Sequence, residues 1–211
     1  MNVGTRARPP LSDGELEHLT ADNFGNIELT DDEKTRLRAI NERRRQETGR
    51  KALEWARAEA PLAQDLRHAG AQVSSVWDLV NTRNKYPNLV PILFAHLSRP
   101  YPEKVREGIA RALVVPEARQ YWTELVDHYL AETDTTTNGV MWALHLAIAA
   151  AADVTVLDTL IRLACDRRHG RNRALFVDAL ARIKDPRAKA ALEELASDPD
   201  LASDVKRVRK T

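Results

Sequence analysis

Histidine, cysteine and glycine are the residues that most often build metal, catalytic and phosphate sites, and their spacing here excludes the common motifs. The six histidines are never three or four residues apart, so no single helix places two of them together as zinc ligands. The one cysteine, Cys165, excludes an internal disulfide and a multi-cysteine zinc site. The eight glycines are at least ten residues apart, which excludes a glycine-rich phosphate loop, and no serine stands in a GxSxG motif. We therefore predict no catalytic residue, no metal site and no cofactor.

Two basic segments are further candidates, because clustered arginines bind anions. The run Lys34 to Arg57 holds nine basic and three acidic residues, a local charge of +6, and is either a solvated face or a phosphate-binding patch. The loop DRRHGRNR, residues 166–173, is either a solvated loop whose arginines bond helix carbonyls or a surface for an anionic protein or nucleic acid. Its basic residues are Arg167, Arg168, His169, Arg171 and Arg173.

The elements that must position these residues are helices. From Pro61 onward, apolar residues recur at steps of three and four, as on one buried helix face; Leu89, Leu93 and Leu97 are an example. The alternation with period two that marks half-buried strands is absent. Breaks at proline, glycine and aspartate limit the helices to about ten to sixteen residues. The sequence predicts an all-α chain.

Residues 1–33 differ from the rest, and we interpret them as an acidic flexible arm. Between Leu11 and Glu33 there are eight acids and no lysine or arginine, so the arm has the charge to fold back on a basic helix. A capping box from Ser12 to Glu15 predicts one short helix in the arm. A second box, from Thr30 to Glu33, opens a basic helix that we expect to end near Glu59. This divides the chain into the arm, a basic helix over 34–60 and a main domain over 61–211.

Apolar positions of the main domain repeat at a nearly constant distance. Leu113, Ile148 and Leu180 are 35 and 32 residues apart. A second series recurs at intervals of 32, 35 and 32 residues: Leu93, Leu125, Leu160 and Leu192. A pair of antiparallel helices cannot bury its apolar face alone, so pairs that recur in this way are expected to stack side by side.

Three segments of the main domain resemble HEAT repeats. VREGIARAL (105–113) and NRALFVDALARI (172–183) are similar to a HEAT second helix, and DPRAKAALEELASDPD (185–200) is similar to a first helix with its Asp-Pro turns. The resemblance implies a right-handed α-α superhelix, a HEAT-like solenoid of four to five helix pairs. We assign the pairs to 88–114, 116–151, 153–183 and 185–210, with a divergent pair at about 52–84. The helix at Val140 departs from the pattern at Met141 and His145.

In HEAT-like stacks the second helices line a concave side that binds extended partners. The resemblance therefore implies a set of binding residues on this side: Trp77, Asn81, Lys104, Arg106, Arg111, Trp142, Arg173 and Asp178. The basic loop adds a charged edge through Arg167, Arg168, His169 and Arg171.

The string SVWDLVN, residues 75–81, is similar to a Trp-Asp-x-Val-Asp segment of HEAT-like DNA glycosylases that remove alkylated purines. In that family the Trp stacks near the damaged nucleotide, the final Asp is catalytic, and an arginine whose place could match Arg106 contacts the DNA backbone. Trp77, Asp78 and Val80 match, but Asn81 stands at the position of the catalytic Asp. An amide cannot replace a carboxylate that activates water or stabilises a sugar cation. The resemblance therefore supports the fold and argues against the activity.

Two tryptophans and one histidine have open interpretations. Trp77 is either a buried ring that joins two repeats or a residue of a nucleotide site. Trp142, together with Met141, is either an exposed apolar spot or part of the core. His145 is expected to be a hydrogen-bonded buried histidine rather than a catalytic one.

Composition restricts the class of partner. The 211 residues are 43% apolar, enough for a sizeable core, and the net charge of +1 argues against a generally basic nucleic-acid-binding protein. The apolar stretch from Val140 to Ala152 is too short to span a bilayer, and the first residues lack the apolar core of a signal peptide, so we expect a cytoplasmic protein with no membrane partner. Our hypothesis is a non-catalytic HEAT-repeat scaffold for a protein partner, itself a monomer or weak homo-oligomer. The alternative is a nucleic-acid-binding relative of the glycosylases without glycosylase activity.

Overall fold

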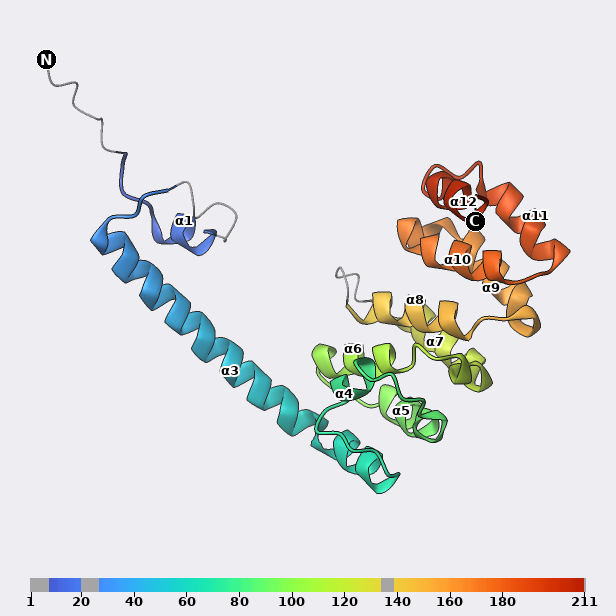
Figure 1. Cartoon of the computed structure of the whole chain (residues 1–211), viewed down its shortest axis with the longest axis horizontal. Helices are drawn as coiled ribbons and strands as arrows, with labels where there is room; N and C mark the ends of the chain where they lie inside the picture. Colours follow the sequence, from blue (N-terminus) through green and yellow to red (C-terminus); the bar gives the residue numbers. More distant parts are fainter. Residues whose placement is uncertain (1–7, 20–26, 134–138, 211) are drawn as a thin grey trace, which may run out of the picture. The chain divides into compact units, whose positions relative to one another are not determined.

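A computed structural model of the chain describes residues 8–19, 27–133 and 139–210, most of which are helical (Figure 1). No strand occurs among these residues, which confirms the predicted all-α class. The chain divides into two compact units, Met1–Glu54 and Trp55–Thr211. The long helix α3 (Asp31–His68) contributes residues to both units.

Two capping boxes start the helices of the first unit. Helix α1 (Asp13–Glu17) begins after Ser12, whose hydroxyl accepts a hydrogen bond from the Glu15 amide while the Glu15 carboxylate accepts one from the Ser12 amide. The same exchange joins Thr30 and Glu33 at the start of α3. These hydrogen bonds confirm both predicted capping boxes. Each box provides partners for backbone amides that the first turn of a helix leaves without one.

Glu33 also joins α3 to the segment that precedes it. Its carboxylate is fully buried and forms an ion pair with Arg8 at 2.7 Å. It accepts further hydrogen bonds from the backbone amides of Leu11 and Thr30. The Arg8 guanidinium and these two amides hold the pKa of Glu33 far below its usual value. Leu11 packs against the apolar cluster of this unit, which consists of Leu16, Leu29 and Ile40.

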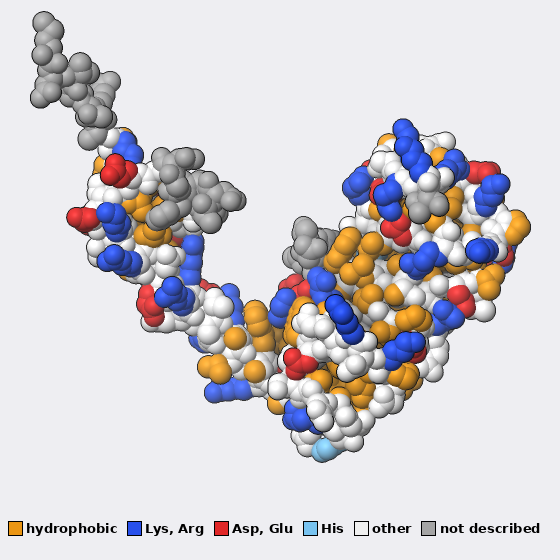
Figure 2. All heavy atoms as spheres, in the orientation of Figure 1, with side chains coloured by type: hydrophobic (Ala, Val, Ile, Leu, Met, Phe, Trp, Pro, Cys, Tyr) orange, Lys and Arg blue, Asp and Glu red, His pale blue; other side chains and the backbone are white. Residues whose placement is uncertain are grey.

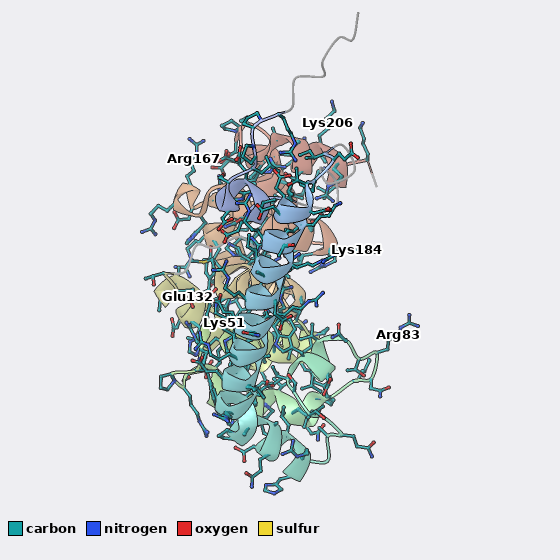
Figure 3. All side chains as sticks on the ribbon, turned by 90° about the vertical axis from the view of Figure 1, so that its left-hand side faces the viewer. Lys51, Arg83, Glu132, Arg167, Lys184 and Lys206 are labelled. Carbon is teal, nitrogen blue, oxygen red and sulfur yellow. The ribbon has the colours of Figure 1, made fainter. Side chains whose placement is uncertain are left out.

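Residues 1–7 and 20–26 of the expected arm lie outside the described residues. The described residues of the arm make specific contacts with α3. Beyond Ile40, the side chains of α3 are exposed as far as Glu54, and many of them are lysine and arginine (Figures 2 and 3).

Helix α3 is longer than predicted, because it ends at His68 and not near Glu59. It continues through Pro61, although a proline inside a helix removes one hydrogen bond and crowds the carbonyl four residues earlier. Leu62 and Leu66, which follow the proline, are fully buried in the core of the second unit. Their burial outweighs the local cost of Pro61, and the expected end of the helix near Glu59 is wrong.

The second unit consists mainly of helix pairs that follow the short helix α4 (Trp77–Val80). The pairs are α5 (Val90–Leu97) with α6 (Glu103–Ala112), α7 (Trp122–Ala131) with α8 (Val140–Ala151), α9 (Leu157–Cys165) with α10 (Ala174–Arg182), and α11 (Pro186–Leu195) with α12 (Ala202–Val208). Short 3-10 turns precede four of these helices: η1 (Pro87–Leu89), η2 (Pro116–Tyr121), η3 (Val154–Val156) and η4 (Arg167–Arg173). Proline stands at the first position of η1, η2 and α11, where its missing amide costs no helical hydrogen bond.

The second helices of successive pairs contact one another in chain order. Helix α8 contacts both α6 and α10, and α10 contacts α12, while the two helices of each pair contact each other. Leu113, Ile148 and Leu180 are fully buried, and so are Leu93, Leu125 and Leu160 of the first helices. The predicted core positions are therefore confirmed.

Among the described residues, no single helix has both the length and the apolar composition needed to cross a bilayer. Two consecutive segments, Val140–Ala151 and Val154–Cys165, are long and apolar enough only when they are taken together. The chain bends by 116° between them.

The burial of the repeat positions leads to a stability prediction. Leu180→Ala should lower the free energy of unfolding by about 2–5 kcal/mol, because it leaves a cavity in the core. Urea denaturation of the full chain, followed by circular dichroism, measures the change. Leu130→Ala removes the same atoms from a side chain that is 53% exposed and should cost less than about 1 kcal/mol. Equal losses in the two variants would contradict the assignment of Leu180 to the core.

Candidate functional site

Trp77 joins α4 to α6. Its half-buried ring lies against Gly108, where a Cβ atom would come within 2.9 Å of the indole nitrogen. The ammonium group of Lys104 lies 4.3 Å from the ring centroid, which is a cation–π contact. These are the contacts of a packing residue that needs a glycine opposite it.

Asn81, at the position of the catalytic Asp in the glycosylase-like string, is exposed and donates a hydrogen bond to the carbonyl oxygen of Trp77 at 3.0 Å. Two carboxylates near Asn81 accept hydrogen bonds from the turn that precedes α4. Asp78 accepts hydrogen bonds from two backbone amides of this turn. Glu59 accepts one from a serine hydroxyl and one from an amide of the same turn. Both carboxylates therefore shape the turn, and neither is placed as a free base for water.

The cations of α6 are paired within the second unit. Lys104 and Arg111 both bind the Glu107 carboxylate, at 2.9 and 2.7 Å. Arg106 binds Glu132 at 2.5 Å and ties α6 to the end of α7. The expected binding residues of this helix thus have carboxylate partners on the same chain.

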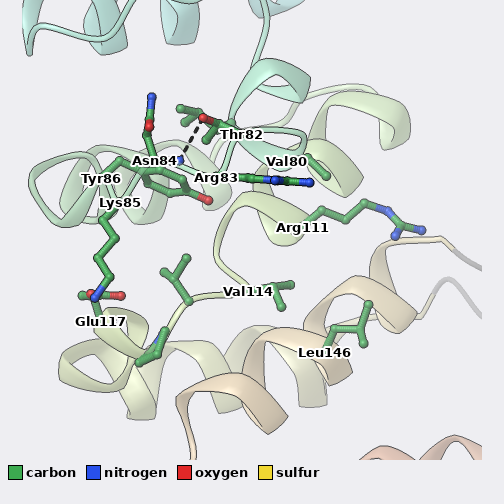
Figure 4. A pocket seen from close by; sticks show the side chains of 13 residues that line it. Val80, Thr82, Arg83, Asn84, Lys85, Tyr86, Arg111, Val114, Glu117 and Leu146 are labelled. Carbon is green, nitrogen blue, oxygen red and sulfur yellow. Dashed lines mark hydrogen bonds between the residues drawn. The ribbon is translucent and has the colours of Figure 1, made fainter.

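A pocket of about 440 Å³ lies between the loop that precedes α5 and the segment that follows α6 (Figure 4). Loop residues 82–86 form one wall, and residues 114–117 form the other. Leu79 and Val80 of α4, Arg111 of α6 and Leu146 of α8 complete the lining. This volume suits a small ligand or a few side chains of a larger one.

The pocket combines positive charge with apolar surface. Arg83 and Lys85 are exposed and have no ion-pair partner among the described residues. Tyr86 donates a hydrogen bond to the carbonyl oxygen of Ala112 at 2.9 Å and so fixes the loop to the end of α6. Burial raises the pKa of Tyr86, which keeps its hydroxyl a donor. The apolar part of the lining includes Leu79, Val80, Val114 and Leu146.

Sequence reasoning missed this pocket. Its only signal is the polar run TRNKYP, residues 82–87, which carries Arg83 and Lys85 between two apolar segments. A run of this kind is also typical of an ordinary surface loop. The pocket exists because the tertiary fold brings Leu146 opposite the loop.

Trp142 extends the apolar surface beside the pocket. It is partly buried and, unlike Met141, does not pack against the described core. Leu146 follows it by four residues and therefore lies on the same side of α8. Asp178, another expected binding residue, forms an ion pair with Arg207 of α12 at 2.9 Å.

The arginines of the basic loop are paired with carboxylates. Arg168 binds Asp166 at 2.6 Å and lowers the pKa of Asp166 to about 2. Arg167 lies 3.4 Å from the carboxylate of Asp198. Arg171 lies 3.5 Å from the carboxylate of Asp204 and donates a hydrogen bond to a backbone carbonyl. The local charge of this loop is therefore largely neutralised by the chain itself.

The expectation that Arg173 is a binding residue is wrong, because its side chain is fully buried and cannot contact a partner. Its guanidinium donates to the Asp198 carboxylate at 2.9 Å. It also donates to the carbonyl oxygens of Ala164 at 3.0 Å and Gly170 at 2.8 Å. Asp198 follows α11, so this ion pair fastens η4 to the last helix pair.

A buried group of rings surrounds His145. Its Nε2 accepts a hydrogen bond from the Tyr129 hydroxyl at 2.8 Å, and its Nδ1 donates to the Met141 carbonyl oxygen at 2.9 Å. Burial lowers the pKa of His145 to about 4. Burial also lowers the pKa of His169, whose ring centroid lies 4.8 Å from that of Tyr129. These contacts confirm that His145 is a hydrogen-bonded buried histidine.

No protein family model, curated protein or solved structure matches the chain. The HEAT-like and glycosylase-like resemblances therefore rest on the residues described above. Within the described ranges, no group of three or more His, Cys, Asp or Glu side chains could hold a metal ion. The candidate functional site is the pocket, with the adjoining side of α8 that carries Trp142.

The buried ion pair of Arg173 leads to a second stability prediction. Arg173→Met should lower the free energy of unfolding by about 3–5 kcal/mol, because the buried Asp198 loses its buried partner and keeps only the exposed Arg167 nearby. Arg168→Met is the matched control: its side chain is 83% exposed, and the loss should be below about 1 kcal/mol. Adding Asp198→Asn to Arg173→Met should restore part of the stability. Urea denaturation measures all three, and a small effect of Arg173→Met would disprove its structural role.

His145 leads to a pH prediction. Between its ordinary pKa of 6.5 and the folded value of about 4, the unfolded chain takes up a proton that the folded chain does not. The free energy of unfolding should therefore fall by about 3 kcal/mol as the pH drops through this window. His145→Gln keeps hydrogen-bonding groups but cannot titrate, so its stability should depend less on pH. Urea denaturation from about pH 7 to about pH 4 compares the two slopes, and equal slopes would rule His145 out as the titrating group.

Proposed function

We propose that the chain is a non-catalytic scaffold that binds a protein partner through the second helices of its larger unit. The architecture we infer is a short HEAT-like solenoid, a right-handed α-α superhelix of four helix pairs preceded by a divergent pair. The repeat of 32 to 35 residues supports it. The contacts of α6, α8, α10 and α12 in chain order support it as well. Pairs stacked in this way leave a long row of side chains outside the core, which suits an extended partner.

The observation that carries the proposal is the pocket of about 440 Å³. Arg83 and Lys85 offer positive charge and form no ion pair among the described residues, although the Glu117 carboxylate also lines the pocket, and Leu146 offers apolar contact area. A partner segment with an acidic side chain next to a large apolar one matches both features. Trp142 enlarges the apolar area, and tryptophan is enriched among the residues that contribute most to protein interfaces.

A protein suits this surface better than DNA. Binding to the DNA backbone requires several free cations along one face. The arginines of α6 and of the basic loop instead bind carboxylates of the same chain. A glycosylase site would also require a carboxylate where Asn81 stands. These features argue against the DNA-binding alternative for the second unit.

Selection from a random peptide library displayed on phage should recover peptides that combine acidic and large apolar residues. Arg83→Glu with Lys85→Glu should weaken their binding at least about tenfold, because two favourable charges become repulsive. Trp142→Ala should cost about 2 kcal/mol, or roughly 30-fold. Fluorescence anisotropy of labelled peptides with the full chain gives the dissociation constants.

The matched control reverses two exposed lysines elsewhere in the same unit, Lys184→Glu with Lys189→Glu. It should leave the affinity within about twofold, because salt screens distant surface charges. Circular dichroism confirms that each variant is folded. Recovery of no peptide, of peptides without acidic residues, or an equal loss in the control would contradict the proposal.

A further inference from the structure

Part of helix α3 has no buried face. Every residue from Asn41 to Glu54 is exposed. From Asn41 to Lys51 the sequence NERRRQETGRK contains no apolar side chain. A surface helix of a globular protein usually packs an apolar stripe against the core, and this segment has no such stripe. Its surface is therefore accessible over several turns, with lysine and arginine along it (Figures 2 and 3).

One side of this helix carries a regular row of cations and hydrogen-bond donors. The row consists of Lys34, Arg38, Asn41, Arg45 and Thr48, all of them exposed. Successive members are four or three residues apart, so their side chains follow one side of the helix. At 1.5 Å per residue, this basic row is about 21 Å long, which is the length of about six base-pair steps.

A shallow hollow on α3 includes part of the basic row. Asn41, Arg45 and Thr48 line it together with Arg44 and Gly49. A Cβ atom at Gly49 would meet no atom within 4 Å, so packing does not require a glycine here. Glycine destabilises an exposed helix relative to alanine, but it allows a ligand to come close to the backbone.

Several cations of this part of α3 are unpaired among the described residues, whereas Lys51 pairs with Glu47 and Arg44 donates a hydrogen bond to the Glu17 carbonyl oxygen. Among the described residues, Arg38, Arg43, Arg45 and Arg50 have no ion-pair or hydrogen-bond partner. Lys34 binds only Asp31, its neighbour by three residues, in an exposed pair that contributes little to stability.

The composition of the segment selects among anionic partners. A helix that binds a membrane surface needs an apolar face, and a protein interface needs apolar or aromatic side chains at its centre. Single-stranded nucleic acid binds by stacking its bases on aromatic rings. The residues from Asn41 to Lys51 include no apolar and no aromatic side chain. They supply arginine, lysine, asparagine, glutamine and threonine, which bond phosphate oxygens.

We propose that the basic row of α3 binds the sugar–phosphate backbone of duplex nucleic acid without reading its sequence. Each cation that neutralises a phosphate releases a counterion, so binding depends strongly on salt. The proposal concerns the first unit alone and does not depend on the function proposed for the second.

Fluorescence anisotropy with the full chain and labelled random-sequence duplexes of about 24 base pairs, one of DNA and one of RNA, tests the proposal. Binding is expected at low salt, with a slope of log K against log salt of about −3 for the three cations of the basic row. Arg38→Gln with Arg45→Gln should reduce the magnitude of this slope by about 2, because two contacts are lost. Arg38→Glu with Arg45→Glu should weaken binding more than about tenfold.

The matched control is Lys184→Glu with Lys189→Glu, which changes the net charge equally but lies in the second unit. It should bind duplexes like the unmodified chain, and circular dichroism should report the same helix content in all variants. The proposal is overturned by the absence of salt-sensitive binding to both duplexes, or by equal weakening in the control. Tighter binding to single strands, to polyglutamate or to phosphatidylserine vesicles than to a duplex also overturns it, since each assigns the basic row to another partner.

Discussion

A pair of amphipathic helices leaves one apolar face in water unless another pair covers it, and the larger unit depends on this constraint. Leu113 caps α6, Ile148 and Leu180 lie in α8 and α10, and all three are fully buried. Because α8 contacts both α6 and α10, removal of one pair would uncover its neighbours. Other side chains of these helices lie outside this core, and the partly buried Trp142 is one of them. This division between core and free side is what makes a binding role physically reasonable.

Charged residues of the same type serve different purposes, and their partners decide which. Arg173 is buried against Asp198, where its charge holds two helix pairs together. Arg83 and Lys85 border a pocket with no carboxylate partner among the described residues. Arg45 lies on an exposed stretch of α3 and forms no ion pair among the described residues. Local charge density therefore does not separate a structural arginine from a binding one.

This is also why sequence reasoning succeeded for some features and failed for others. The capping boxes and the apolar steps depend on residues three or four apart, so the spacing alone predicts them. Arg173 and Arg168 belong to the same basic loop, but only Arg173 is fully buried. Its partner Asp198 lies 25 residues further along the chain, so no local pattern reveals the pair. Pro61 indicates a break unless the burial of Leu62 is known. The pocket depends in the same way on Leu146, which no local pattern connects to the loop around Arg83.

Helix α3 shows how a segment without a core of its own can persist. Like charges one turn apart and full exposure to water both disfavour an isolated helix. Each end of α3 is therefore anchored by a different means. In the first unit, the apolar cluster around Ile40 is small, and the buried Glu33 carboxylate adds the hydrogen bonds that fix Arg8 and Leu11 to the first turn. In the second unit, burial of the turns after Pro61 anchors the other end. Because both anchors lie outside residues 41–54, those positions are free to carry charge, while Lys34 and Arg38 of the basic row are exposed beside the buried Glu33 and Ile40.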